Sequence, residues 1–358
     1  MNTIQNNSIH LQHYGLDDRV RTLAHTFGEN PIIARVITQE KNLYRVVCNS
    51  GELLAEVSGR LRYAAATPAD FPGVGDFVLL DRDNDAGGHA IIHRVLPRKS
   101  LFVRRAAGKA LAGQVVAANI DTIFICMSLN QNFNIHRLER YLALAYESGA
   151  QPVVVLTKAD LCHTLNQRLA EVYAVAIGTE VFVTSALSRE GFDTLKSFLI
   201  PGHTAAFLGS SGAGKSTLIN GLLGEGRLAT GGLRDDDQGR HTTTHRELIR
   251  LPGGSLVIDT PGMRELGMWN VSTGFEKSFE DIEALTQNCR FRNCTHTTEP
   301  GCAVLAAIAH GTLSPDRFRS YEKLVAEAAY GDDPDAYLAK KAQKFKAIAK
   351  ANRPKKKH

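Results

Sequence analysis

The feature that most constrains this 358-residue chain is a glycine-rich loop between an apolar strand and a helix. It matches the pattern G-x-x-x-x-G-K-[ST], in which backbone N–H groups and a helix N-terminus converge on phosphate oxygens. The loop follows the run TAAFL, precedes the helical sequence LINGLLG, and consists of Gly209, Ser210, Ser211, Gly212, Ala213, Gly214, Lys215, Ser216 and Thr217. We expect Lys215 to reach the β- and γ-phosphates of a nucleoside triphosphate and the Ser216 hydroxyl to ligate Mg²⁺.

The residues around this loop predict an α/β domain over 106–270. Near-continuous apolar runs, among them DTIFICM, PVVVLT, VFVTS and SLVID, alternate with helical stretches. That alternation is typical of a parallel sheet covered on both faces. Asp259 ends the run SLVID about 45 residues after the loop, in the sequence D-T-P-G. We expect Asp259 to hold Mg²⁺ through water and the amide of Gly262 to meet the γ-phosphate.

A second motif precedes the phosphate loop and indicates which base is bound. The run PVVVLT ends in Thr157, Lys158, Ala159 and Asp160, similar to the N-K-x-D element of GTPases. A carboxylate accepts two hydrogen bonds from guanine, whereas adenine would leave it unpaired, so we expect GTP and GDP as ligands. Alternatively, this segment is only a helix N-cap. The next predicted strand ends near Ser185 and Ala186, which resemble the loop that supports the base.

The segment before the α/β domain predicts a small β-barrel over 31–105. Five short β-rich runs, IIARVIT, LYRVVC, ELLAEV, DFVLL and AIIHRV, are separated by turn residues. Five strands of this length fit an OB-fold, whose exposed face often binds oligonucleotides, although a spacer barrel fits as well. The following segment RKSLFVRR is interpreted as a basic link that can be simply solvated. Residues 1–30 form an N-terminal extension without an assignment.

A cluster of potential metal ligands follows the α/β domain, within a predicted helical domain over 271–332. Its spacing is C-x4-C-x-H-x5-C, and its members are Cys289, Cys294, His296 and Cys302. Three thiolates and one imidazole complete a tetrahedral Zn²⁺ shell with no position open for substrate, which predicts one structural zinc per chain. The alternative is a set of buried cytosolic cysteines.

The charge of the chain is concentrated at its C-terminus. The formal net charge is +5, yet the 23 residues from Ala336 to His358 hold nine Lys or Arg and no acid, so the rest is net −4. We expect a basic tail over 333–358, helical and amphipathic at its start, that binds a polyanion such as rRNA or is merely solvated. No run of eighteen apolar residues and no secretory leader occur, so we expect a cytoplasmic protein without membrane contact.

The order of these motifs is unusual, because ordinary GTPases begin with the phosphate loop. Here the base motif and Ser185-Ala186 come first, then the phosphate loop, then a threonine-rich segment and D-T-P-G. This permuted order, an upstream barrel and a downstream cysteine cluster together resemble the ribosome small subunit-dependent GTPase A (RsgA) family. The resemblance implies an OB-fold barrel, a circularly permuted P-loop GTPase domain of the α/β class and an α-helical zinc-binding domain.

The same resemblance implies GTP hydrolysis, stimulated by the ribosome, in a late step of small-subunit assembly. The partners are then the small ribosomal subunit and its rRNA, and we expect a monomer. By family position Thr243 closes on Mg²⁺ and the γ-phosphate, although spacing alone does not separate it from Thr242 or Thr244. Position 263 is methionine, which cannot orient water, so His241 is the candidate for that role unless it is a solvated loop histidine. The competing function is a nucleotide-gated RNA-binding regulator acting on another RNA, in which hydrolysis is incidental.

Overall fold

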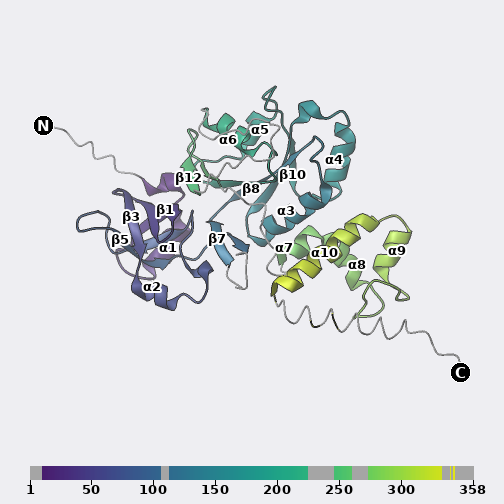
Figure 1. Ribbon diagram of the computed structural model, residues 1–358, viewed down its shortest axis with the longest axis horizontal. Coiled ribbons are helices and arrows are strands. Elements are labelled where there is room, and N and C mark those ends of the chain that lie inside the picture. Colours follow the sequence, from purple (N-terminus) through teal and green to yellow (C-terminus); the bar gives the residue numbers. More distant parts are fainter. Residues whose placement is uncertain are drawn as a thin grey trace. The chain divides into compact units, whose positions relative to one another are not determined.

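The computed structural model describes residues 10–105, 113–224, 246–259 and 273–332, together with residues 339 and 342. The chain divides into two compact units, Met1–Leu266 and Gly267–His358 (Figure 1). The first unit contains a barrel and an α/β sheet, and the second contains helices and the cysteine cluster. Within the described part of the chain, no helix combines the length and the apolar character needed to cross a membrane.

The first unit begins with two short helices and a closed five-stranded barrel. The helices are η1 (Leu11–Tyr14) and α1 (Asp18–His25). The barrel strands are β1 (Ile32–Glu40), β2 (Leu43–Cys48), β3 (Gly51–Val57), β4 (Phe77–Leu80) and β5 (Ala90–Val95). Their order is β1-β2-β3-β5-β4, and β4 pairs back to β1, which closes the barrel. The five strands expected from the sequence are therefore confirmed, and α2 (Gly59–Ala64) and η2 (Pro68–Asp70) fill the connection from β3 to β4.

The segment expected to be a basic link is instead structured. It contains strand β6 (Leu101–Arg105), which pairs antiparallel with β7 (Gly113–Ala118). Arg98 donates to both carboxylate oxygens of the fully buried Asp76, at 2.8 and 2.7 Å. Lys99 pairs with Asp121 at the start of the α/β domain. The interpretation of these two basic residues as solvated charge was therefore wrong, because the acids that pair with them are distant in sequence.

The α/β part of the first unit is a six-stranded sheet in the order β10-β9-β8-β11-β13-β12. All neighbours are parallel except β12 and β13, so the expected parallel sheet is extended by one antiparallel strand. The strands are β8 (Thr122–Ser128), β9 (Gln151–Thr157), β10 (Glu180–Val183), β11 (Thr204–Leu208), β12 (Glu247–Arg250) and β13 (Leu256–Asp259). The helices are α3 (Ile135–Glu147), η3 (Ala159–Leu161), α4 (Leu165–Tyr173), α5 (Phe192–Ser197) and α6 (Lys215–Leu223).

Helices cover both faces of this sheet, as the sequence predicts. In β8, Phe124 and Cys126 belong to a core formed with α5 and α6. Because successive side chains of a strand alternate between faces, Ile123 and Ile125 point to the opposite face. Helix α3 packs against β8 and β9 and buries Leu138. Helix α3 therefore lies on the face of the sheet opposite to α5 and α6.

One buried arginine ties the barrel to the sheet. Arg35 of β1 is 1% exposed, and burial lowers its pKa to about 10. Its guanidinium donates to the carbonyls of Tyr14 (2.6 Å), Gly75 (3.1 Å) and Asn119 (3.3 Å) and to the hydroxyl of Thr204 in β11 (2.8 Å). Strand β1 also pairs with the sheet edge β12. The barrel and the α/β sheet therefore share one hydrogen-bonded frame.

The described residues of the second unit form helices and the loop that carries the cysteine cluster. Its helices are α7 (Thr273–Ser278), α8 (Glu280–Gln287), α9 (Ala303–Ala309) and α10 (Pro315–Asp332). Phe275 and Phe279 are fully buried and contact the ring of Tyr321 from α10. The basic tail lies outside the described residues except at positions 339 and 342, which are helical.

Candidate functional site

The phosphate loop lies between β11 and α6, where its motif predicts it. Gly209 packs so closely on β8 that a Cβ atom there would lie 2.5 Å from the carbonyl oxygen of Cys126. Gly214, which precedes α6, has a φ of +87°, a conformation that favours glycine. Burial raises the pKa of Cys126, beneath the loop, to about 12. The glycines are thus required by close packing and by the turn into the helix.

Lys215 is held at the mouth of this loop. Its Nζ donates to the carbonyl oxygens of Gly209 at 2.7 Å and Ser210 at 2.8 Å. An ammonium group fixed there, beside the first N–H groups of α6, is suited to holding phosphate oxygens. Ser216 and Thr217 follow in the first turn of α6.

The base motif lies directly against the phosphate loop. Thr157, at the end of β9, is 4% exposed, and its hydroxyl donates to the carbonyl of Ala213 at 2.8 Å. Lys158 follows with a φ of +59°, in the left-handed region, and Ala159 begins η3. Thr157 occupies the place of the asparagine in N-K-x-D, and its hydrogen bond therefore holds the phosphate loop in position. The sequence did not indicate this contact, because the two residues are 56 positions apart.

The carboxylate expected to select the base is oriented by the next strand. The hydroxyl of Ser185, 1% exposed, donates to Oδ1 of Asp160 at 2.6 Å. The N–H of Ala159 donates to the carbonyl of Thr184 at 3.2 Å, which ties the base motif to the loop after β10. Asp160 and Ala186 are exposed, so the carboxylate oxygen that Ser185 does not use can be reached by a ligand. The structure thus brings together the base motif, Ser185 and the phosphate loop.

Four predicted site residues belong to segments that the structure describes only in part. Asp259 is the last residue of β13, and its side chain is outside the described parts. Gly262, His241 and Thr243 lie entirely outside the described residues. Strand β13 is the direct neighbour of β11, so the backbone at Asp259 is in the strand next to the one that carries the phosphate loop.

The second unit assembles the predicted metal ligands in one place. The ligand atoms of Cys289, Cys294, His296 and Cys302 all lie within 4.8 Å of one another. The Cys289 and Cys302 sulfurs are 3.9 Å apart, and Nδ1 of His296 lies 3.6 Å from the first and 3.4 Å from the second. Zn–S and Zn–N bonds of about 2.3 and 2.0 Å give tetrahedral edges of about 3.5–3.8 Å. The donor set and its spacing therefore fit a zinc ion.

Local hydrogen bonds prepare this cluster. Cys289 follows α8 and Cys302 caps α9, where its sulfur accepts from the N–H of Leu305. Burial opposes ionisation of the Cys289 thiol, but backbone N–H donors at the start of α9 hold its pKa below the usual value. Glu299 accepts from the hydroxyl and N–H of Thr295 and from the N–H of Thr297, which lowers the pKa of its carboxyl. Glu299 therefore fixes the loop that carries His296, a role that the spacing of the cysteines did not reveal.

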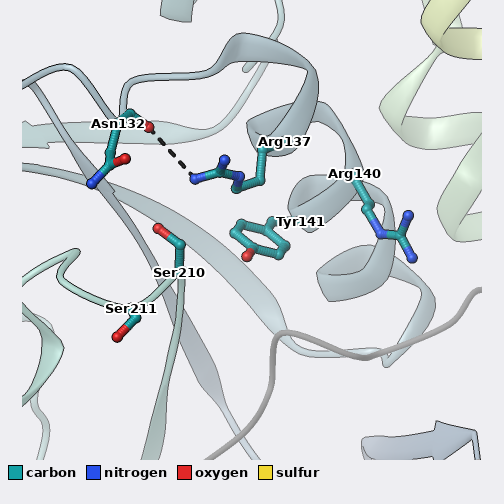
Figure 2. A pocket seen from close by; sticks show the side chains of 6 residues that line it. All are labelled: Asn132, Arg137, Arg140, Tyr141, Ser210 and Ser211. Atoms are coloured by element: carbon teal, nitrogen blue, oxygen red, sulfur yellow. Dashed lines mark hydrogen bonds between the residues drawn. The ribbon is translucent and has the colours of Figure 1, made fainter. Parts of the chain in front are cut away.

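A pocket that the sequence did not predict lies between α3 and the phosphate loop (Figure 2). It has a volume of about 500 Å³ and is lined by Asn132, Arg137, Arg140, Tyr141, Ser210 and Ser211. The only sequence signal for it was a pair of arginines three residues apart, which share one face of a helix.

Comparisons with known proteins agree with this geometry. Residues 95–269 match the family model described as RsgA GTPase. The chain is 49% identical over 325 residues to "Small ribosomal subunit biogenesis GTPase RsgA 2" of Lactiplantibacillus plantarum, covering 90% of each chain. It is also 49% identical over 312 residues to the RsgA of Opitutus terrae, covering 85% of each.

Solved structures show the same architecture. The crystal structure of YjeQ from Thermotoga maritima matches with a TM-score of 0.62 and 25% identity, covering 84% of this chain and 99% of that one. YloQ, titled a circularly permuted GTPase, has the same fold with a TM-score of 0.58, covering 84% of this chain and 96% of that one. The resemblance drawn from the motif order is thus confirmed: the chain belongs to the RsgA GTPase family.

Proposed function

We propose that this protein hydrolyses GTP to GDP and phosphate while bound to the small ribosomal subunit and its rRNA, in a late step of subunit assembly. The names of its relatives support a role in small-subunit biogenesis. The observation that carries the proposal is the 2.8 Å hydrogen bond from Thr157 to Ala213, which joins a base-selecting element to a phosphate loop. A purine nucleotide can therefore be held at both ends by adjoining loops.

In this proposal each end of the nucleotide has its own ligands. Asp160, oriented by Ser185, accepts from guanine, while the Lys158 stem and the backbone at Ala186 flank the base. The loop from Gly209 to Thr217 holds the phosphates. Ser216 and Asp259 would hold Mg²⁺, which neutralises phosphate charge when bound.

For the switch segments, Gly262 would meet the γ-phosphate through its amide, and Thr243 would close on the same group. His241 would orient the attacking water in place of the glutamine that this chain lacks. Because positioning supplies most of phosphoryl-transfer catalysis, we expect slow turnover that rises when the subunit orders these segments.

The remaining parts are proposed to bind RNA. The strand order of the barrel supports an OB-fold. The cysteine cluster would hold a structural zinc that folds the loop carrying Arg290 and Arg292. The break between compact units at Leu266 supports a boundary near residue 270 between the GTPase domain and the zinc domain. The other proposed parts are the N-terminal extension over 1–30, the barrel over 31–105 and the basic tail over 333–358. The sequence after D-T-P-G leads directly into the zinc domain, so we propose that nucleotide state moves that domain against rRNA.

Calorimetry with GTP and ATP, with and without small subunits, tests the proposal. We expect GTP to bind far more tightly than ATP. The variant Asp160→Asn should shift preference toward xanthosine triphosphate, because an amide donates where the carboxylate accepts. His241→Ala should lose stimulated turnover while retaining GTP binding; unchanged turnover would favour the alternative of an RNA-binding regulator. Equal affinity for GTP and ATP in the wild type would refute the proposal.

A further inference from the structure

The pocket between α3 and the phosphate loop has the composition of an anion site. Two of its six lining residues are arginines, and the others carry a carboxamide, two serine hydroxyls and one phenol. No carboxylate lines it among the described residues. Figure 2 shows Arg137 extending from α3 toward Asn132, with Tyr141 beside it and Ser210 and Ser211 on the neighbouring phosphate loop. Several hydrogen-bond donors and positive charge therefore surround one hollow.

This pocket adjoins the cradle that would hold the triphosphate, but most of its lining lies outside the phosphate loop. Its lining includes neither Lys215 nor Ser216, and it includes no residue of the base motif. It shares only Ser210 and Ser211 with the phosphate loop, which forms one of its walls. Arg137 and Arg140 are half-buried and reach it from α3. A ligand in the pocket would therefore touch the phosphate loop from the side of α3.

The chemistry of the lining favours a phosphodiester. A guanidinium presents a planar fork of donors that matches two phosphate oxygens, and serine hydroxyls and an asparagine amide can donate to the remaining oxygens. A volume of about 500 Å³ exceeds the size of one phosphate group and is in the range of sites for small organic ligands. A phosphate together with its ribose fits this space better than a free inorganic ion.

We propose that this pocket binds a backbone phosphate of an RNA strand, with Arg137 as the main ligand, and so connects RNA binding to the phosphate loop. The inference rests on the proposed function, because the small ribosomal subunit supplies the RNA. It gives a physical route by which RNA can steady the loop that holds GTP. Among the described residues, the Arg137 side chain donates one long hydrogen bond, 3.5 Å, to the carbonyl of Asn132, so turning toward a phosphate costs little.

The experiment measures binding of purified small subunits to the full-length protein with a GTP analogue, over a series of salt concentrations. We expect Arg137→Ala to weaken binding about fivefold to tenfold and to reduce the slope of log K against log salt by about 0.7–0.9, the loss of one phosphate contact. Arg137→Lys should keep the slope, because the charge remains, and recover only part of the affinity.

Lys196→Ala is the matched control. It also removes one positive charge from the GTPase domain, but Lys196 belongs to α5, on the opposite face of the sheet, and pairs with Asp193 at 3.3 Å. We expect wild-type affinity and salt slope. If both alanine variants lost the same affinity for the subunit, the loss would follow from the change in net charge of the protein, and the proposal would be overturned.

Two further results would overturn it. Arg137→Ala could bind subunits with the wild-type affinity and slope, or it could lose affinity for the GTP analogue in the absence of subunits, which would place the arginine on the nucleotide. If the wild type itself fails to bind small subunits in every nucleotide state, the proposed function fails as well. The wild-type measurement thus separates that failure from one confined to Arg137.

Discussion

Replacing Thr157 by valine tests whether the base motif also supports the phosphate loop. Valine has nearly the shape of threonine but lacks the hydroxyl that donates to Ala213 at 2.8 Å. Thr157 is 4% exposed and Ala213 is 1% exposed, so water cannot readily replace the lost donor. The substitution therefore removes one buried hydrogen bond and leaves the packing of β9 nearly unchanged.

The size of the effect follows from the cost of an unpaired buried carbonyl. That cost is about 1–3 kcal/mol, and about 1.4 kcal/mol corresponds to a tenfold change in affinity. If the free protein relaxes the loop to avoid the unpaired group, binding must restore the strained conformation. We then expect the dissociation constant for GTP to rise between about 5-fold and about 150-fold.

Base selection should survive this change, because we propose that Asp160, oriented by Ser185, carries it. Inosine triphosphate lacks the 2-amino group of guanine, so the ratio of GTP to ITP affinity reports on contacts with the base alone. We expect calorimetry to show the same ratio in Thr157→Val as in the wild type. Asp160→Ala should lower the ratio.

Thr157→Ser is the control, because it keeps the hydroxyl and should bind GTP within about threefold of the wild type. A valine variant with wild-type affinity would refute the proposed support of the phosphate loop. So would a variant that loses the preference for GTP over ITP, since that result would place residue 157 on the base instead.

Three other predictions concern the junction of barrel and sheet, the core beneath the phosphate loop and the cysteine cluster. Arg35→Met should lower the free energy of unfolding of the first unit by about 3 kcal/mol in urea, because it leaves several buried acceptors unpaired. An unchanged urea midpoint would contradict the proposal that Arg35 holds the barrel and the sheet together. Cys126, with a pKa raised by burial to about 12, should resist iodoacetamide up to pH 10 in the folded protein, while the half-buried Cys162 is alkylated, as peptide mass spectrometry can show. Removing the zinc proposed for the cysteine cluster with a chelator should raise hydrogen exchange over residues 289–309 and leave α7 and α10 protected by their aromatic core; uniform loss of protection would contradict this.

The sequence predicted those features whose cause is local. The glycines of the phosphate loop are required by a turn that begins a helix. Each of the five barrel strands is a short apolar or alternating run of a few residues between turn residues. The cysteine spacing of the metal cluster lies within fourteen residues. Each pattern can therefore be recognised without knowing how distant segments pack.

The missed features all depend on contacts between distant segments. Arg35 occurs in a strand-like run, and nothing in that run shows that its guanidinium meets Thr204, 169 positions away. Strand β12 is four residues long, and its pairing with β1 is a tertiary event. Arg137 and Arg140 of α3 line a pocket with Ser210 and Ser211, which are about 70 positions away in the sequence.

The permuted chain order leaves the site geometry unchanged, because that geometry depends on which strands are neighbours. Strands β9, β8, β11 and β13 are consecutive and parallel, so their carboxyl ends lie along one edge of the sheet. The base motif follows β9, the phosphate loop follows β11, and Asp259 ends β13, whatever their order along the chain.

Permutation changes which domains are attached to the strands of the site. The chain enters the α/β domain from a barrel whose strand β1 pairs with β12, and the sequence after Asp259 leads into the unit with the cysteine cluster. In an order that begins with the phosphate loop, the segment after Asp259 would instead continue into the remaining strands of the sheet.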